Sequence, residues 1–355
     1  ADATPLFIML IGEIYRWGFA DKVRSLLPNV HRAIDWMENY GDRDNDGFIE
    51  YQRATENGLP NQGWKDDLSS ISFVDGELAQ TPIALAEVQG YAYAAYLAHS
   101  TIAAAESDAA TAQRSLKKAQ RLKDLFNKKF WAEELGYIAL ALDKDKRLVN
   151  AKASNMGHCL WAGLLEPEKA ALVGRQLISP DMFTGWGIRT LGASAARFNP
   201  ASYHTGSVWP HDTAIIVAGL MKYGLVDAAH RILLGMLGAA EHLNFRLPEL
   251  FSGFTRQEFD TPISYPAACE PQAWAAAAPL LLTRAMLRLE PDLTTGTLAL
   301  MPDIPHEIGE VVIRNMQIGM NNITITANVM THSVTGLPEG IRLVEQSHRQ
   351  PPIST

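Results

Sequence analysis

Two short segments of the sequence place carboxylates among aromatic and apolar residues. One, at residues 61–67, has the sequence NQGWKDD, and the other, at residues 247–251, has the sequence LPELF. An apolar wall raises the pKa of a carboxyl group by desolvation, and a second carboxylate raises that pKa further, which suits a general acid near neutral pH. Asp66 and Glu249 are therefore candidates for acid–base chemistry, although a solvated turn and a simple ion pair would also explain them. Glu270, just before a predicted helix, could simply cap that helix.

A third group of residues is suited to binding sugars. Residues 203–212 have the sequence YHTGSVWPHD, and residues 186–189 have the sequence WGIR. Aromatic rings stack on the apolar faces of a sugar, while His, Asp and Arg side chains hydrogen-bond its hydroxyl groups. Asp212 could instead cap a helix, and His211 could be a core histidine. His204 and His211 lack a third ligand at a suitable spacing, so we predict no metal site here.

An acidic turn at residues 42–49, DRDNDGFI, matches the first eight positions of a calcium-binding loop. The twelfth position of such a loop supplies a bidentate carboxylate, and here that position is Arg53. We therefore favour an Asx-rich turn that positions Tyr51 and Arg53 over a calcium site.

The composition excludes several classes of protein. The chain has 355 residues, of which 47% are hydrophobic and 20% charged, as expected for one large globular domain or about two smaller ones. No stretch of about 18 uncharged apolar residues occurs, so no transmembrane helix is predicted. A formal net charge of −8 argues against a nucleic-acid groove or an anionic membrane surface, because both require a basic face. The two cysteines, Cys159 and Cys269, are far apart, which predicts reduced thiols.

The beginning of the chain does not resemble a targeting segment. Residues 1–5, ADATP, lack the basic region that precedes the apolar run of a signal peptide. We therefore expect a cytoplasmic protein. Because the chain has no initiator Met, we also expect a mature or excised piece of something longer.

Hydrophobic spacing predicts nine helices. The clearest covers residues 109–131, where an apolar stripe is opposite a stripe of lysines and arginines. The others are expected at residues 4–18, 22–40, 82–105, 154–164, 167–178, 211–223, 225–243 and 271–290. A small hairpin is expected from residues 136–142 and 146–149, and strands at residues 297–301, 311–318 and 322–329.

Long loops alternate with the helix pairs, at residues 41–80, 179–210 and 244–269. This pattern is typical of a ring of helical hairpins in which the long loops gather at one end and build a pocket. A closed ring of six hairpins needs twelve helices. Either some helices escape the pattern, or the opening helices of the ring lie outside this chain.

Four motifs carry a resemblance to a known family. They are NQGWKD at residues 61–66, EVQGY at 87–91, YHTGSVWPHD at 203–212 and PELF at 248–251. Together they resemble the C-terminal catalytic domain of the amylo-α-1,6-glucosidase, or glycogen-debranching-type, family. That family is similar to mannosylglycerate hydrolase, the neutral trehalases and glucoamylase. The resemblance extends from residue 2 to about residue 305.

The resemblance implies an all-α (α/α)6 barrel, without its first helices on this chain, and an inverting glycoside hydrolase acting on an α-linked glucoside or oligosaccharide. By match to the family's motifs, Asp66 would be the general acid and Glu249 the general base. No cofactor and no metal are implied. The implied substrate-binding residues are Tyr51, Trp64, Lys65, Asp67, Gln89, Trp186, Arg189, His204, Trp209, His211, Asp212 and Gln272.

We expect the barrel at residues 1–292, a small β-rich appendage at residues 293–345 and a tail at residues 346–355. The expected partners are a glycoside and a preceding N-terminal segment or domain, but no nucleic acid and no membrane. Two other functions fit parts of the sequence. An incomplete barrel could bind glycan without hydrolysing it. A terpenoid cyclase on a helical toroid would need a DDxxD or DxDD motif, and the sequence after Asp66 supplies neither.

Overall fold

The computed structural model describes residues 1–345, so the predicted tail at residues 346–355 lies outside the described residues. The predicted mostly helical fold is confirmed. No helix in the described part is long and apolar enough to cross a bilayer. The helices are α1 (Ala3–Arg16), α2 (Ala20–Val23), α3 (Leu27–Trp36), α4 (Ala86–Ala105), α5 (Ala109–Lys129), α6 (Asn155–Ala162), α7 (Pro167–Leu177), α8 (Pro210–Lys222), α9 (Val226–His242) and α10 (Ala273–Leu287).

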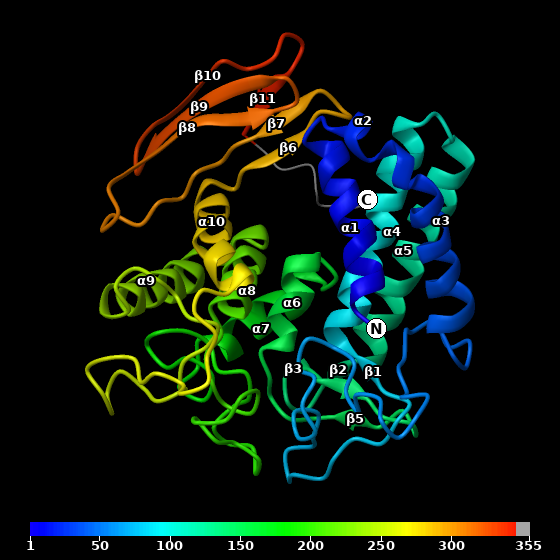
Figure 1. Cartoon of the computed structure of the whole chain (residues 1–355), viewed down its shortest axis with the longest axis vertical. Coiled ribbons are helices and arrows are strands. Elements are labelled where there is room, and N and C mark those ends of the chain that lie inside the picture. Colours follow the sequence, from blue (N-terminus) through cyan, green and yellow to red (C-terminus); the bar gives the residue numbers. More distant parts are fainter. Residues whose placement is uncertain (346–355) are drawn as a thin grey trace.

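Five helices form an inner row in which each packs against the next, in the order α1, α4, α6, α8 and α10. An outer layer covers this row: α3 packs on α1, α5 on α4, α7 on α6 and α9 on α8 (Figure 1). The inner helices α4, α6 and α8 are surrounded by other helices, so most of their residues are buried. Their apolar residues are therefore not confined to one face.

The inner row is open between its two ends in residues 1–345 (Figure 1). Helix α10 does not pack along α1 there, and an ion pair between Arg284 and Glu13, at 3.0 Å, connects the two. Both helices also expose apolar side chains to solvent. Leu10 of α1 is 58% exposed and Leu280 of α10 is 73% exposed. The described helices therefore form an arc, and the arc does not close on itself.

The C-terminal part is built from two small sheets around a second hydrophobic core. One sheet has the order β10-β9-β8 and is antiparallel, and the other has the order β11-β7-β6 with β11 parallel to β7. Leu287 and Leu289 at the end of α10 pack into this core with Leu298, Ile318 and Ile325. The strands are β6 (Glu290–Asp292), β7 (Thr297–Ala299), β8 (Glu310–Ile318), β9 (Asn321–Asn328), β10 (His332–Thr335) and β11 (Arg342–Val344). The three predicted strands correspond to β7, β8 and β9.

Two predicted helices are shorter than expected. Residues 22–40 do not form one helix, because a 3₁₀ turn at Arg24–Leu26 separates α2 from α3. Pro28 lies in the first turn of α3, where its ring is tolerated; further inside a helix it would clash with the preceding turn. The helix expected from residue 82 begins at Ala86, because the preceding residues pair as strand β1 (Ala84–Leu85) with β4 (Ala141–Leu142).

The predicted hairpin around residues 143–145 is confirmed in a more divided form. Strand β4 pairs in antiparallel register with β5 (Leu148–Val149), while β3 (Tyr137–Ile138) pairs with β2 (Trp131–Ala132). These short strands lie at the end of the helical row that also carries the long loops (Figure 1).

Gly219 tests the close packing of α8 on α6. A Cβ atom at this position would lie 2.6 Å from the backbone nitrogen of Trp161, which cannot move away as a flexible side chain could. We expect Gly219→Ala to lower the free energy of unfolding by about 1–3 kcal/mol, measured by urea denaturation.

Gly238→Ala in α9 is the matched control. Its Cβ would meet side-chain atoms no closer than 3.7 Å, and alanine favours a helix over glycine by about 1 kcal/mol. This variant should be neutral or stabilised. Equal stability of the two variants would contradict the tight α6–α8 contact.

Candidate active site

The loops that carry the predicted acid–base residues are joined by backbone pairing. Val208 and Phe251 form an antiparallel bridge with N–H to O distances of 2.9 and 3.0 Å in the two directions. Val208 also pairs with Arg189, and Phe251 with Ser264. At Gly253 the approach is so close that a Cβ atom would lie 1.7 Å from a backbone oxygen of the neighbouring loop. The loops after α7 and α9 are therefore held in a fixed register.

Glu249 is buried two residues before this bridge, and both of its carboxylate oxygens are bound. The hydroxyl of Tyr203 donates a hydrogen bond to Oε1 at 2.7 Å, and the backbone N–H of Cys269 donates one to Oε2 at 3.1 Å. The carboxylate is therefore held in one orientation by two different loops.

Asp66 is exposed. Burial raises the pKa of Tyr203, and the hydrogen bond to Glu249 and the nearby negative charges of Glu249 and Asp66 raise it further. Both candidate acids thus raise the pKa of one tyrosine hydroxyl, Glu249 through a hydrogen bond and its charge and Asp66 through its charge. Asp66 also borders an open pocket of about 400 Å³, which is lined by Ala1, Asp2, Leu59, Gln62, Gly63 and Asp66.

Trp64 is the centre of an aromatic cluster that contains residues from four parts of the chain. Its ring stacks on His158 at 5.7 Å between centroids, with an interplanar angle of 8°. It meets the rings of His204, Trp209 and His211 edge to face, at 5.6, 5.7 and 5.0 Å. The cluster is extended by Trp274 of α10, which stacks on His211 at 3.9 Å and is 37% exposed.

Lys65 is buried and bound within the protein. Its Nζ atom donates hydrogen bonds to Asn155 Oδ1 and to the Thr190 carbonyl, both at 2.6 Å. Burial lowers the pKa of Lys65 to about 8, although the nearby Asp212 carboxylate opposes this shift. Lys65 therefore links the Asp66 loop to α6 and to the loop after α7.

Asp212 and His158 form a buried pair, with 2.6 Å between Asp212 Oδ1 and His158 Nε2. The other ring nitrogen of His158 lies 2.5 Å from the Tyr91 hydroxyl. Burial alone would raise the pKa of Asp212, but His158 and Lys65 hold it below its usual value. Burial raises the pKa of Glu87, which lies nearby on α4. A chain of polar side chains thus connects α4, α6 and α8 behind the aromatic cluster.

Several shielded polar atoms of this cluster have no hydrogen-bond partner within residues 1–345. Burial lowers the pKa of His211 to about 3, so its ring is neutral near pH 7 and offers one donor and one acceptor. A buried polar atom without a partner costs about 1–3 kcal/mol, which a hydroxyl-bearing ligand or water would recover. The atoms are Trp64 Nε1, His204 Nε2, His211 Nδ1 and Asp212 Oδ2.

Asp67 does not lie against Asp66 as a second free acid. Its Oδ1 atom accepts hydrogen bonds from the N–H and the hydroxyl of Ser69, and its Oδ2 atom lies 3.0 Å from His204 Nδ1. Burial would raise the pKa of Asp67, but these contacts outweigh it and lower the pKa to about 2.

The structure places four other predicted binding residues away from the Trp64 cluster. Gln89 is buried and hydrogen-bonds the backbone of Ile49, and Tyr51 donates a hydrogen bond to Asn61 at 2.7 Å. Arg189 donates to the carbonyl of Gly253 at 2.9 Å and also to those of Pro180 and Asp181. Trp186 is buried under Arg256. These four side chains contact other parts of the chain and stabilise the loops around the site.

Gln272 lies at the start of α10 and caps it. Its Oε1 atom accepts a hydrogen bond from the N–H of Ala275 at 3.0 Å. This contact fixes the first turn of α10, where Trp274 joins the aromatic cluster.

Sequence analysis did not single out four residues that the structure brings to the site. Tyr203 stands beside His204 in the predicted sugar-binding segment, so its position was available as a signal. Trp274 follows two residues after Gln272. His158 and Glu87 lie in the helices predicted at residues 154–164 and 82–105, and Glu87 begins the EVQGY motif, but the burial of both near Lys65 and Asp212 requires the tertiary structure.

The acidic turn at residues 42–49 forms the predicted Asx-rich turn, with the N–H groups of Asp46, Gly47 and Phe48 bound to its Asp side chains. Carboxylate oxygens of Asp42, Asp44 and Asp46 lie within 4.8 Å of one another. The ammonium group of Lys146 contacts Asp44 and Asp46, both at 2.7 Å, and Glu50. A lysine thus holds the position of a cation in this turn.

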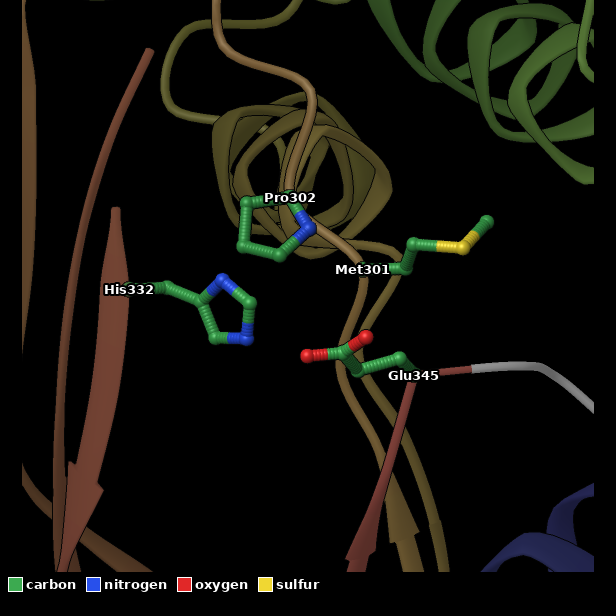
Figure 2. Close-up of a pocket in the computed structure, with 4 residues that line it drawn as sticks. All are labelled: Met301, Pro302, His332 and Glu345. Carbon is green, nitrogen blue, oxygen red and sulfur yellow. The ribbon is translucent and has the colours of Figure 1, made fainter. Parts of the chain in front are cut away.

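Another pocket, of about 340 Å³, lies in the C-terminal part and is lined by Met301, Pro302, His332 and Glu345 (Figure 2). The side chains of His332 and Glu345 point toward one another across it (Figure 2). Its lining offers one carboxylate and no Trp, Tyr or Phe ring, so it lacks both the pair of acids and the stacking surface of the Trp64 region.

An arc of helix pairs whose long loops bring a buried acid and an aromatic cluster to one end suits the binding of a carbohydrate. Residues 5–255 match the family described as the mannosylglycerate hydrolase MGH1-like glycoside hydrolase domain. The chain therefore belongs to this glycoside hydrolase family. No curated protein matches the chain significantly.

Solved structures share the fold at low sequence identity. The GH63 mannosylglycerate hydrolase from Thermus thermophilus, solved in complex with glucose, has a TM-score of 0.61 at 18% identity. The match covers 79% of this chain and 75% of that one. An uncharacterised conserved protein from the same organism has a TM-score of 0.60 at 17% identity, and the match covers 79% of this chain and 77% of that one. A chain titled "Sialidase" gives 0.63 at 16% identity over 87% of this chain, which spans 28% of that longer chain.

Asp212→Asn tests the buried pair behind the aromatic cluster. Removing the charge leaves His158 and Lys65 without their buried partner, so we expect a loss of about 3 kcal/mol in the free energy of unfolding at pH 7, measured by urea denaturation. Because the folded pKa of Asp212 is lowered, its contribution is full above about pH 4 and is lost as the pH falls through the folded value.

Asp227→Asn is the matched control for this variant. Asp227 is an exposed acid in the first turn of α9, as Asp212 is a buried one in the first turn of α8. We expect Asp227→Asn to lower the free energy of unfolding by only about 0.3–1 kcal/mol, the usual size of a helix-dipole contribution. Similar losses for both variants at pH 7 would count against the buried pair.

Proposed function

We propose that the chain is an inverting glycoside hydrolase that acts on an α-linked glucoside or oligosaccharide, with Asp66 as general acid and Glu249 as general base. The observation that carries this proposal is the Tyr203 hydroxyl, which donates a hydrogen bond to Glu249 and has its pKa raised by the nearby charge of Asp66. Membership of a glycoside hydrolase family supports the reaction class.

The inverting reaction assigns different work to the two acids. Glu249 takes a proton from a water molecule as that water attacks the anomeric carbon, and Asp66 protonates the departing glycosidic oxygen on the opposite face of the sugar. The two carboxyl groups of inverting enzymes are separated by about 6.5–9.5 Å, which leaves room for the water. The two fixed hydrogen bonds on Glu249 leave it oriented toward one water position.

The sugar ring is proposed to lie against the aromatic cluster. Trp64 and Trp274 reach the surface and offer apolar faces and edges, as sugar-binding sites do, while the buried Trp209 packs against both. The partnerless polar atoms of His204, His211 and Asp212 would then take its hydroxyl groups. Lys65 and Arg189 bind groups of the chain itself, so neither side chain is available to an anionic leaving group in this conformation.

Asp66→Asn and Glu249→Gln test the two roles. Each amide keeps the shape of the side chain and removes the proton transfer, so we expect kcat to fall at least about 10²-fold to 10⁴-fold. The substrates should include α-1,4- and α-1,6-linked glucosides, because the sequence resembles debranching enzymes, and an α-mannoside of glycerate, because the Thermus relative is a mannosylglycerate hydrolase. Proton NMR of the first product should show the inverted anomer.

Asp75→Asn and Glu270→Gln are the controls. Asp75 is an exposed acid of the same long loop as Asp66, and Glu270 is an exposed acid near Glu249. Both should retain wild-type rates. Wild-type turnover by Asp66→Asn would remove it from the acid role, and a product of retained configuration would exclude the inverting mechanism.

A second candidate function is carbohydrate binding without hydrolysis. The open side between α1 and α10 and the exposure of Asp66 favour it, because a general acid gains its raised pKa from an enclosing wall. Helices supplied by another segment would complete an (α/α)6 barrel at this position. Calorimetry and NMR on one sample distinguish the two functions: binding of a glucoside with no released sugar after a long incubation would favour the binding module.

A further inference from the structure

One contact joins the loop of Asp66 to the loop that supplies Tyr203, the hydrogen-bond partner of Glu249. Asp67 follows Asp66, and His204 follows Tyr203, which holds Glu249. Asp67 Oδ2 and His204 Nδ1 are 3.0 Å apart. The loop of the proposed acid is thus connected to the loop after α7, whose Tyr203 holds the proposed base.

Both members of this contact are themselves fixed. The Asp67 carboxylate is also bound by the N–H of Ser69 at 2.7 Å and by its hydroxyl at 3.0 Å. His204 is 1% exposed, its ring stacks on Trp209 at 5.0 Å, and Trp64 meets it edge to face. A movement of either side chain would therefore disturb several other contacts.

We infer that Asp67 and His204 are positioning residues, and that their hydrogen bond sets the distance and angle between Asp66 and Glu249. This inference rests on the proposed function and assigns these two residues a role in addition to binding sugar. A misplacement of about 1 Å in a catalytic group can lower a rate about 10²-fold. The single hydrogen bond between Asp67 and His204 can therefore have a large effect on turnover.

The contact also fixes the tautomer of His204. An ionised carboxylate can only accept hydrogen bonds, so the proton on the Asp67 side must be carried by His204 Nδ1. In the neutral ring Nε2 is then an acceptor. That atom is buried without a partner in the described residues, so it can receive a hydrogen bond from a substrate hydroxyl.

Substitutions of His204 can separate the two roles, because the amide nitrogen of Asn overlays Nδ1 and that of Gln overlays Nε2. His204→Asn keeps the link to Asp67 but loses Nε2 and the ring, so we expect a raised KM and a kcat at least about threefold above that of His204→Gln. His204→Gln and Asp67→Asn disturb the link, and we expect kcat to fall about 10-fold to 100-fold with a smaller change in KM. The double variant Asp67→Asn/His204→Gln should be no slower than the slower single variant, because both remove one interaction.

His230→Gln is the matched control, since His230 also contacts an aspartate, Asp303, but lies on α9. It should leave kcat unchanged. The inference is overturned if His204→Asn is as slow as His204→Gln, or if Asp67→Asn keeps wild-type kcat. Asp66→Asn is assayed in parallel: if it too keeps wild-type turnover, the proposed function fails, whereas full loss there with unchanged Asp67→Asn defeats the positioning role alone.

A measurement on the wild-type protein covers the case in which the variants do not fold. Long-range proton–nitrogen correlation NMR on histidine-labelled protein reports which ring nitrogen carries the proton. His204 should show a protonated Nδ1 at pH 7, and a His204 ring protonated at Nε2 alone would overturn the proposed link.

Discussion

The backbone bridge between Val208 and Phe251 is the constraint on which the candidate site depends. Two N–H to O hydrogen bonds at this bridge, extended to Arg189 on one side and Ser264 on the other, turn two long loops into one small ladder. Loops of this length would otherwise sample many conformations, at an entropic cost for each ordered residue. The ladder fixes Tyr203 against Glu249, and side chains such as Arg189 reinforce it by binding carbonyl groups of the neighbouring loops.

A second constraint comes from charge in the interior. Lys65, Asp212, His158 and Glu87 are all buried, and a buried charge is tolerated only when partners and hydrogen bonds compensate for its lost hydration. Their contacts run from the Asp66 loop to α4, α6 and α8. The loop with the exposed acid therefore rests on a polar network anchored in the inner helices. This network, more than the loop's own turn chemistry, gives Trp64 a defined position.

The open side of the helical arc gives the site an asymmetric environment. Glu249 is enclosed by two loops, whereas Asp66 borders an open pocket near the beginning of α1. The family match and the shared fold with the Thermus hydrolase agree with the helical arrangement, and the GH63 chain is longer than the part that this chain covers. The open side of the helical arc thus determines how far Asp66 is exposed to solvent.

Local patterns in the amino-acid sequence were enough to predict most helices and strands and the types of side chain in the candidate site. Hydrophobic periodicity depends on local spacing, so the long helices could be predicted within a few residues, and the Ile/Thr alternation of β9 marked a strand. The motifs also named Asp66, Glu249 and the Trp64 and Trp209 rings. A 3₁₀ turn divides the helix predicted at residues 22–40. The pairing of Ala84–Leu85 with β4 delays the start of α4, because pairing with a distant segment can override a local pattern.

Long-range packing was needed to establish which polar residues face the site and which support it. Asp67 is hydrogen-bonded to His204 and Ser69. Lys65 donates a hydrogen bond to Asn155, and Gln89 donates one to the backbone of Ile49. These partners are far apart along the chain in most cases, and the identity of a residue does not reveal which distant group satisfies its hydrogen bonds.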